Sequence, residues 1–145
     1  VYNETLRDRV CAVSNKTHYN EMNVLSMHAL IGAYQPQGYE WVDELNQVLA
    51  GNIEYFCDYV DEHFEGVSYS RPQGTYMVFL DCTEWCREHG RDIQWLLDEG
   101  ARVGVGYQDG RPFHGPCHIR VNLALPLSRV REACDRLDRY VFNAR

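Results

Sequence analysis

Apolar positions recur at helical spacing through the first half of the chain and alternate with polar ones in later segments. The most periodic stretch runs from about residue 39 to 64, with apolar side chains on one face and acidic and amide side chains on the other. This pattern predicts a long amphipathic helix. Two shorter helices are predicted over residues 2–16 and 20–34. The second is separated from the long helix by the turn-forming residues 35–38. The apolar positions of the long helix are Val42, Leu45, Val48, Leu49, Ile53, Phe56, Val60 and Phe64.

The period changes after Gly66, where β-branched and aromatic residues dominate and strands are expected. The predicted strands span residues 67–70, 75–81, 103–105 and 118–123, and the second is expected to be buried on both faces. A short helix is predicted over residues 92–98, capped at its end by Gly100. A last helix is predicted, with Ser128 as its cap and an apolar face of Val130, Ala133, Cys134, Leu137 and Val141. The expected fold is α+β: a small antiparallel or mixed sheet of three or four strands, with helices mainly on one face.

Length and composition fit one globular domain, since 145 residues can enclose a core and 45% of them are hydrophobic. The net charge of −7 argues against nucleic-acid binding, which requires clustered Lys and Arg. No apolar run reaches the length of a membrane span, and no signal peptide is recognisable at the start. Together with the reduced cysteines expected below, this favours a cytoplasmic location. The chain opens at Val1, not at a methionine, which fits a fragment or a processed product.

The six cysteines have two possible explanations besides disulfides. Cys11, Cys57 and Cys134 fall within helical patterns, where free cysteines behave as small hydrophobic residues, so reduced thiols are expected. Zinc is the alternative, because cysteines and histidines gather in two short segments. Their spacing lacks the paired Cys-x-x-Cys of a structural site, and we rank a zinc-stabilised domain last and predict no metal. The residues of the two segments are Cys82, Cys86 and His89, and His114, Cys117 and His118.

Arg120 is the strongest candidate for a functional side chain. It lies in a strand pattern after a glycine-rich loop, and a guanidinium presents a planar, two-pronged donor that matches a carboxylate. The alternative is an arginine whose stem covers the sheet and whose head meets a surface acid. The glycine-rich loop, Asn122 and Pro126 favour carboxylate binding.

Two segments together resemble the small domain of the aspartate-aminotransferase superfamily of pyridoxal-phosphate (PLP) enzymes, in the branch of cystathionine beta-lyase-like aminotransferases. They are RPQGTYMVFLD at residues 71–81 and HIRVNLALP at residues 118–126. Weaker similarity extends over the rest of the chain, through residues 6–9, 33–34 and 41–43. The loop between residues 103 and 120 departs from the family's Pro-Gly-x-x-Phe-Gly pattern, which leaves substrate-side specificity open.

The resemblance implies a role for several residues. Arg120, followed by Asn122, would hold the α-carboxylate of an amino-acid substrate, while Gly74 and Tyr76 would line the mouth of the active site. Residues 1–36 would be the end of a large cofactor-binding domain, and residues 37–145 the carboxyl-terminal small domain with its connecting helix. The full-length protein would be a homodimeric, PLP-dependent aminotransferase or carbon–sulfur lyase.

The Schiff-base lysine of the family would lie upstream of Val1. The one lysine of the chain, Lys16, is expected at a polar helix end, whereas a catalytic lysine needs burial or a neighbouring cation. The isolated chain is therefore predicted to be inactive. A non-catalytic alternative remains: a standalone amino-acid-binding or interaction module in which Arg120 still recognises a carboxylate. The coding sequence before Val1 would separate these two hypotheses.

Separation from a large domain predicts self-association of the isolated chain. The helix predicted at residues 20–34 carries an apolar face of Val24, Leu25, Met27 and Ile31, which would otherwise be buried. Sedimentation velocity at increasing concentration is expected to show oligomers. A strictly monomeric profile at high concentration would contradict this expectation.

Overall fold

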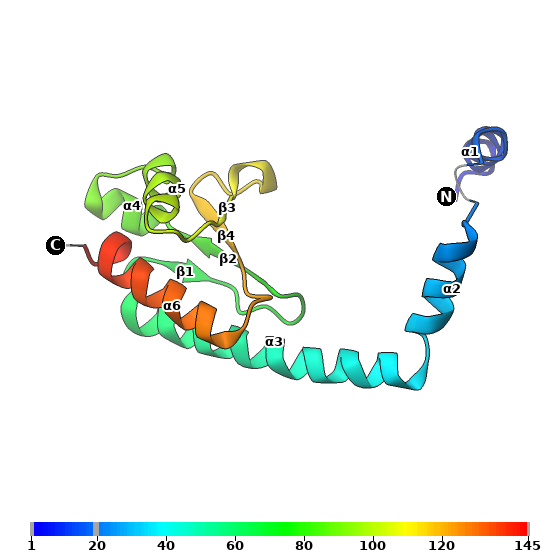
Figure 1. Cartoon of the computed structure of the whole chain (residues 1–145). Coiled ribbons are helices and arrows are strands. Elements are labelled where there is room, and N and C mark those ends of the chain that lie inside the picture. Colours follow the sequence, from blue (N-terminus) through cyan, green and yellow to red (C-terminus); the bar gives the residue numbers. More distant parts are fainter. Residues whose placement is uncertain (1, 19–20, 145) are drawn as a thin grey trace. The chain divides into compact units, whose positions relative to one another are not determined.

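The computed structural model describes residues 2–18 and 21–144. The chain divides into two compact units, and the division falls between Asp43 and Glu44. The first unit contains two short helices and the start of a long one. The second contains the rest of the long helix, a four-stranded sheet and the remaining helices (Figure 1).

The first unit begins with helix α1 (Glu4–Thr17) and helix α2 (Val24–Ala33), which confirms the two helices predicted there. Asn3 and Asn23 cap them, each accepting a hydrogen bond from a backbone N–H of the first turn at 2.9 Å. Helix α2 therefore begins after its asparagine cap, not at residue 20, which lies outside the described residues. The apolar side chains of α2 are spread around all sides of the helix, and Leu25 is 82% exposed.

Helix α3 (Pro36–His63) is the long amphipathic helix predicted from the periodic pattern. The expected break at residues 35–38 is wrong in part, because Pro36 opens the helix. Proline suits the first turn, where its missing N–H has no helical partner and its backbone angle is already helical. The buried face of α3 lies within the second unit and comprises Asn52, Phe56, Cys57 and Val60.

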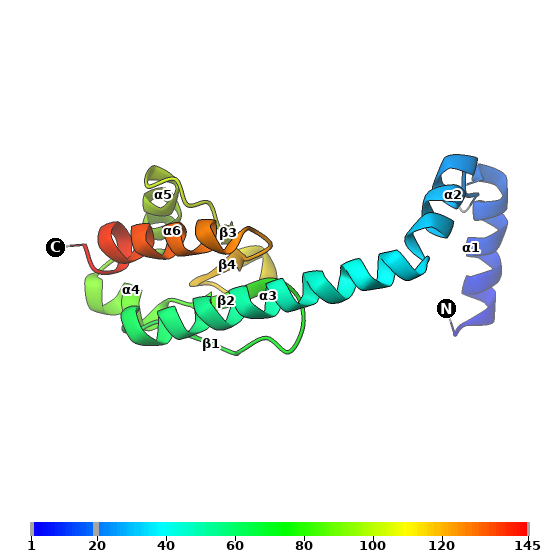
Figure 2. The same cartoon turned by 60° about the horizontal axis from the view of Figure 1, so that its bottom comes forward.

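The sheet is antiparallel throughout, with strand order β1-β2-β4-β3, and it confirms the α+β class (Figure 2). Its central pair is β2 with β4, in which Phe79 lies opposite Arg120 and Asp81 opposite His118. Only two-residue strands flank this pair. The strands are β1 (Ser68–Tyr69), β2 (Met77–Asp81), β3 (Gln108–Asp109) and β4 (His118–Asn122).

The central strands alternate between a buried and an open face. Val78 and Leu80 of β2 and Ile119 and Val121 of β4 are at most 8% exposed, while the residues between them face outward. The expectation that residues 75–81 are buried on both faces is therefore wrong. Met77 and Phe79 are apolar, so the sequence of β2 does not reveal that one face of the strand is open. In the structure, no helix of the second unit covers these two side chains fully.

Three sequence-based boundaries need correction. Residues 103–105 do not form an edge strand, because Gly104 adopts a left-handed backbone (φ +78°) and the edge strand is β3. Helix α5 (Ile93–Arg102) does not end at Gly100, where a Cβ would come within 2.5 Å of the Tyr107 ring. That glycine permits close packing. Helix α4 (Thr83–His89) was not expected as a separate element.

The last helix, α6 (Leu127–Leu137), continues into a π-helical turn at Asp138–Phe142. Its cap is Pro126, so the expected Ser128 cap is wrong. The predicted apolar face is confirmed, because Val130, Cys134, Leu137 and Val141 are buried, while Ala133 is half-buried. Helices α3 and α6 run side by side, and the Tyr59 hydroxyl donates a 3.1 Å hydrogen bond to Asp138 at the end of α6 (Figures 1 and 2).

All six cysteines are free thiols. Cys57 and Cys134 are buried as expected, but Cys11 is exposed, which corrects its assignment as a packed hydrophobic residue. No helix among the described residues is long and apolar enough to cross a membrane.

A buried side-chain amide links α3 to the turn that follows β4 through hydrogen bonds. The Asn52 side chain is 1% exposed, and its Nδ2 donates to the carbonyl oxygens of Leu123 (2.9 Å) and Leu125 (2.8 Å). Both donor hydrogens of the amide are thus used by one turn. This contact sets the turn that connects β4 to α6.

Replacing Asn52 is expected to destabilise the second unit. Asn52→Ala should lower the free energy of unfolding by about 2–3 kcal/mol, since it leaves carbonyl groups without a donor. Asn52→Asp removes the donor while keeping the shape and should cost at least as much. Asn46→Ala, on the exposed side of the same helix, is the control and should change stability by less than about 0.5 kcal/mol. Urea denaturation measures all three, and equal midpoints would contradict the role of Asn52.

Candidate functional site

The open face of the sheet carries the candidate site. Alternation along β2 and β4 places Phe79 and Asp81 on the same face as His118, Arg120 and Asn122. In the register of the sheet, Arg120 lies between Phe79 on one neighbouring strand and Gln108 on the other. The side chain is therefore held at the centre of the sheet by backbone pairing on both sides.

Arg120 is half-buried, and its guanidinium carbon lies 4.6 Å from the centre of the Phe113 ring. Phe113 belongs to the short 3₁₀ helix Arg111–Phe113, which follows β3. Within residues 2–18 and 21–144, no acidic group forms an ion pair with Arg120, and no hydrogen bond runs from its guanidinium to an acceptor. Stacking on an aromatic ring fixes the plane of the guanidinium and leaves its edge available to a carboxylate. The alternative of a surface acid as its partner does not hold for the described residues.

Glycines bring the loop before β4 close to the sheet. An added Cβ at Gly115 would lie 2.6 Å from the Phe79 ring, and one at Gly110 would collide with the carbonyl oxygen of His118. Any larger residue would push the loop and Phe113 away from the strand. The glycine-rich loop noted in the sequence therefore serves to pack Phe113 against Arg120.

His118 and Asp81 lie beside Arg120 on the same face. The Nε2 atom of His118 is 3.8 Å from Oδ2 of Asp81, and its ring lies 4.7 Å from that of Phe79. The Nδ1 atom is buried and has no hydrogen-bond partner among the described residues. Burial acts to raise the pKa of Asp81, but hydrogen bonds from Thr83 and the nearby His118 hold it below its usual value. Asp81 is thus an ionised carboxylate at neutral pH, and it lines a hollow of about 320 Å³ with His118.

The other three predicted site residues are Asn122, Gly74 and Tyr76. Asn122 shares the face of Arg120, but its Oδ1 accepts a 2.8 Å hydrogen bond from the backbone of Ala124 and so shapes the turn after β4. Gly74 and Tyr76 line a separate groove of about 580 Å³ between α3 and the loop before β2. Tyr76 directly precedes Met77, which faces the open side, so strand alternation directs Tyr76 away from Arg120.

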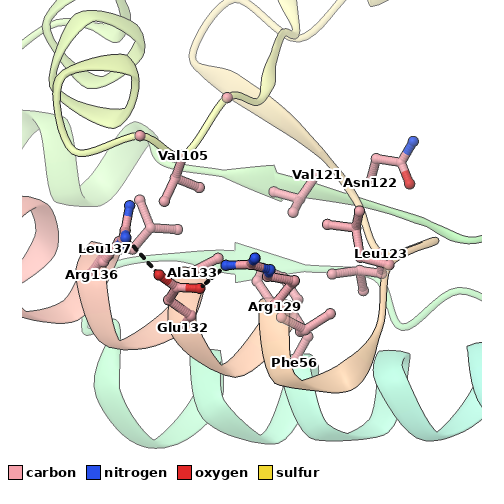
Figure 3. Close-up of a pocket in the computed structure, with 14 residues that line it drawn as sticks. Phe56, Val105, Val121, Asn122, Leu123, Arg129, Glu132, Ala133, Arg136 and Leu137 are labelled. Atoms are coloured by element: carbon pink, nitrogen blue, oxygen red, sulfur yellow. Dashed lines mark hydrogen bonds and ion pairs between the residues drawn. The ribbon is translucent and has the colours of Figure 1, made fainter.

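A second hollow, of about 370 Å³, lies between α6, the end of β4 and the loop at Gly104 (Figure 3). Its walls are mostly apolar, and Glu132 bridges Arg136 (2.6 Å) and Arg129 (2.7 Å) at its rim. Hydrogen bonding from Arg129 and the charge of Arg136 lower the pKa of Glu132. Val121 lines this hollow from the core face of β4, so it lies on the opposite side of the strand from Arg120. Sequence reasoning missed it because its walls come from four separated segments.

The described residues do not fit a site that holds PLP. Lys16 is exposed in the last turn of α1 and belongs to the first compact unit, whereas Arg120 belongs to the second. A lysine that forms a Schiff base needs burial or a neighbouring cation. Among the described residues, moreover, no group of three or more His, Cys, Asp or Glu could hold a metal ion. What the described residues do offer is a half-buried guanidinium, that of Arg120, without an acidic partner.

Curated relatives share clear sequence similarity with the chain. A putative cystathionine beta-lyase from Mycobacterium leprae is 35% identical over 124 residues, and one from Mycobacterium tuberculosis H37Rv is 32% identical over 128 residues. Each match covers 74% of this chain and 30% of the relative. No protein-family model matches the chain.

Solved structures share its fold. A PLP-bound putative aminotransferase from Clostridium difficile superposes with a TM-score of 0.80 at 23% identity, over 95% of this chain and 35% of that one. The PLP-bound C-S lyase of Staphylococcus hominis gives 0.76 at 23% identity, over 94% and 35%. Cystalysin from Treponema denticola gives 0.76 at 22% identity, over 95% and 34%.

The chain thus spans about a third of the length of the proteins that it matches. The sequence similarity confirms the resemblance seen in residues 71–81 and 118–126, and the superpositions confirm the α+β fold. In sequence, this chain is similar to about a third of the length of cystathionine beta-lyase-like proteins, and it shares the fold of the matching part of PLP-bound aminotransferases and carbon–sulfur lyases.

Proposed function

We propose that the whole protein is a PLP-dependent aminotransferase or carbon–sulfur lyase that acts on amino acids, and that Arg120 binds the substrate α-carboxylate. The observation that carries this proposal is the guanidinium of Arg120, oriented by Phe113 and without an acidic partner among the described residues. A half-buried cation without a partner is costly to keep unless it serves a ligand. An amino-acid α-carboxylate matches its two-pronged edge.

The remaining site residues have smaller roles in this proposal. Asn122 would shape the turn beside the substrate through its bond to Ala124. Gly74 and Tyr76 would form part of the mouth from the α3 side of β2. Since they lie away from Arg120, their substitution should affect the choice of substrate more than binding of the α-carboxylate.

We assign the groups that hold PLP to the larger part of the relatives' length, which this chain does not match. There the cofactor would supply the electron sink for chemistry at the amino-acid α-carbon. Residues 1–36 would belong to that large domain, and residues 37–145 would form the small domain. The apolar surface on all sides of α2 supports this division, because such a helix is normally buried. Assembly as a homodimer in the cytoplasm is part of the same proposal.

A second candidate is a binding module without catalysis. The exposed position of Lys16 favours it for the isolated chain, since Arg120 could recognise a carboxylate without any lysine. A coding sequence before Val1 that contains a lysine-bearing loop would support the enzyme, and a stop codon would support the module.

Substitution of Arg120 in the full-length protein is expected to impair catalysis. Arg120→Ala should lower kcat/KM for amino acids and cystathionine by roughly 30- to 1000-fold, because losing a charge-paired contact costs about 2–4 kcal/mol. Arg120→Lys should recover only part of the loss, since an ammonium lacks the two-pronged geometry. Arg131→Ala is the matched control, because Arg131 also stacks on an aromatic ring, 5.2 Å from the centre of Tyr55.

Steady-state kinetics, with cofactor absorbance recorded for each variant, would separate the two parts of this proposal. Bound cofactor with unchanged kinetics in Arg120→Ala would remove the carboxylate role and keep the enzyme class. A parent protein without bound cofactor would favour the binding module.

The isolated chain of residues 1–145 is expected to be inactive with added PLP. Any absorbance change beyond that of free PLP should come from an imine with the exposed Lys16 or with the α-amino group of the chain, and the part due to Lys16 should disappear in Lys16→Ala. Spectrophotometry with a panel of amino acids tests this. Turnover that survives Lys16→Ala would show that the chemistry does not need a lysine of this chain.

A further inference from the structure

Three cysteines outside the candidate site converge where β2 and β4 begin to separate. The strand register continues one residue beyond the Asp81–His118 pair, because the backbone N–H of Cys82 donates to the carbonyl of Cys117 at 2.9 Å. Residues directly opposite in such a pair have Cα atoms roughly 5.5 Å apart. Alternation places both side chains on the core face, after Leu80 and before Ile119.

Cys86 joins this pair from helix α4. Its backbone N–H donates to the carbonyl of Cys82 at 2.9 Å, so the two cysteines are four residues apart on one side of the helical turn. The side chain of Cys117 lies close enough to Cys86 to raise the pKa of its thiol. Cys82 is fully buried, Cys86 is 5% exposed and Cys117 is half-buried.

The chemistry available to this cluster of three thiols is oxidation. Among the described residues the cluster does not meet the geometry of a metal site. Two neighbouring thiols can instead lose two electrons and two protons to form a disulfide. Cys117 is the half-buried member that solvent reaches, and Cys86 is its buried neighbour.

We propose that Cys117 and Cys86 form an oxidative modification site, in which a hydroperoxide converts the two adjacent thiols into a disulfide. The Cys117 sulfur attacks the peroxide oxygen, forms a sulfenic acid and releases water. The Cys86 sulfur then attacks the sulfenic sulfur and releases a second water. Overall, two thiols and one hydrogen peroxide yield one disulfide and two waters. This inference does not depend on the proposed function.

Burial assigns the order of the two steps. It raises the pKa of Cys86 to about 12, an effect increased by the nearby Cys117 side chain, and it raises the pKa of Cys82 well above its usual value. Since the thiolate is the nucleophile, neither buried thiol is suited to the first attack. The disulfide would tie the first turn of α4 to the segment that leads into β4, the strand that carries Arg120.

Peptide mapping of the full chain tests this site. Cys11→Ser is introduced throughout, because Cys11 is exposed and would otherwise cross-link between molecules. The protein is treated with hydrogen peroxide, alkylated, denatured and digested with chymotrypsin, which cuts after Trp85 and so separates Cys82 from Cys86. We expect a linked pair of peptides containing Cys86 and Cys117, about 2 Da lighter than the sum of the two thiol peptides.

Matched variants give the controls. Cys86→Ser and Cys117→Ser should each abolish the linked peptides, whereas Cys57→Ser and Cys134→Ser, at buried cysteines outside the cluster, should retain them. Mapping of the Cys11→Ser parent alone is decisive if a variant fails to fold. A bond from Cys117 to Cys82 would overturn the assigned pair. Unlinked thiols, or Cys117 oxidised without a link, at peroxide levels that oxidise Cys11 in the unmodified chain would overturn the proposal.

Discussion

Antiparallel pairing of β2 with β4 is the constraint on which the rest of the second unit depends. Because successive side chains on a strand point to opposite faces, this one register sends four aliphatic residues into the core and directs Arg120 outward. A shift by one residue would bury the guanidinium and expose Ile119 and Val121. Burial of each aliphatic side chain contributes about 1.5–3 kcal/mol, so the core holds Arg120 on the open face.

Contacts from outside the sheet then refine this arrangement. Asn52 fastens α3 to the turn after β4, and the glycines at positions 110 and 115 allow the preceding loop to approach the strand. The loop carries Phe113, whose ring orients the guanidinium. Fold stability and the candidate carboxylate site thus share the same strand: one face supplies the core, and the other presents the charge.

The two compact units differ in how far they bury their apolar side chains. The second encloses a core that contains Trp85, Phe64 and Phe142, with the two phenylalanine rings stacked at 4.3 Å. The first has no buried residue in α1 or α2, although α2 is the most apolar helix of the chain. This contrast agrees with a chain that matches about a third of the length of its relatives.

Much of the local structure could be predicted from the sequence, because it depends on residues a few positions apart. The spacing of apolar residues identified α3 and the buried face of α6, and the residues around Arg120 identified both the family and the candidate arginine. Local patterns were less reliable where two causes produce the same signal. Gly100 read as a helix cap but allows Tyr107 to pack closely, and apolar residues on both sides of β2 suggested burial on both faces.

Only the tertiary structure decided which distant residues meet. The register of β4 and the path of its preceding loop bring Phe113 to Arg120, Asp81 to His118, and Cys117 near Cys86. Separation along the chain contains no information about that register. The sequence by itself determined the elements, the family resemblance and the chemistry available, since these follow from residue type and spacing. The arrangement of that chemistry followed from strand pairing and from the burial of one face of the sheet.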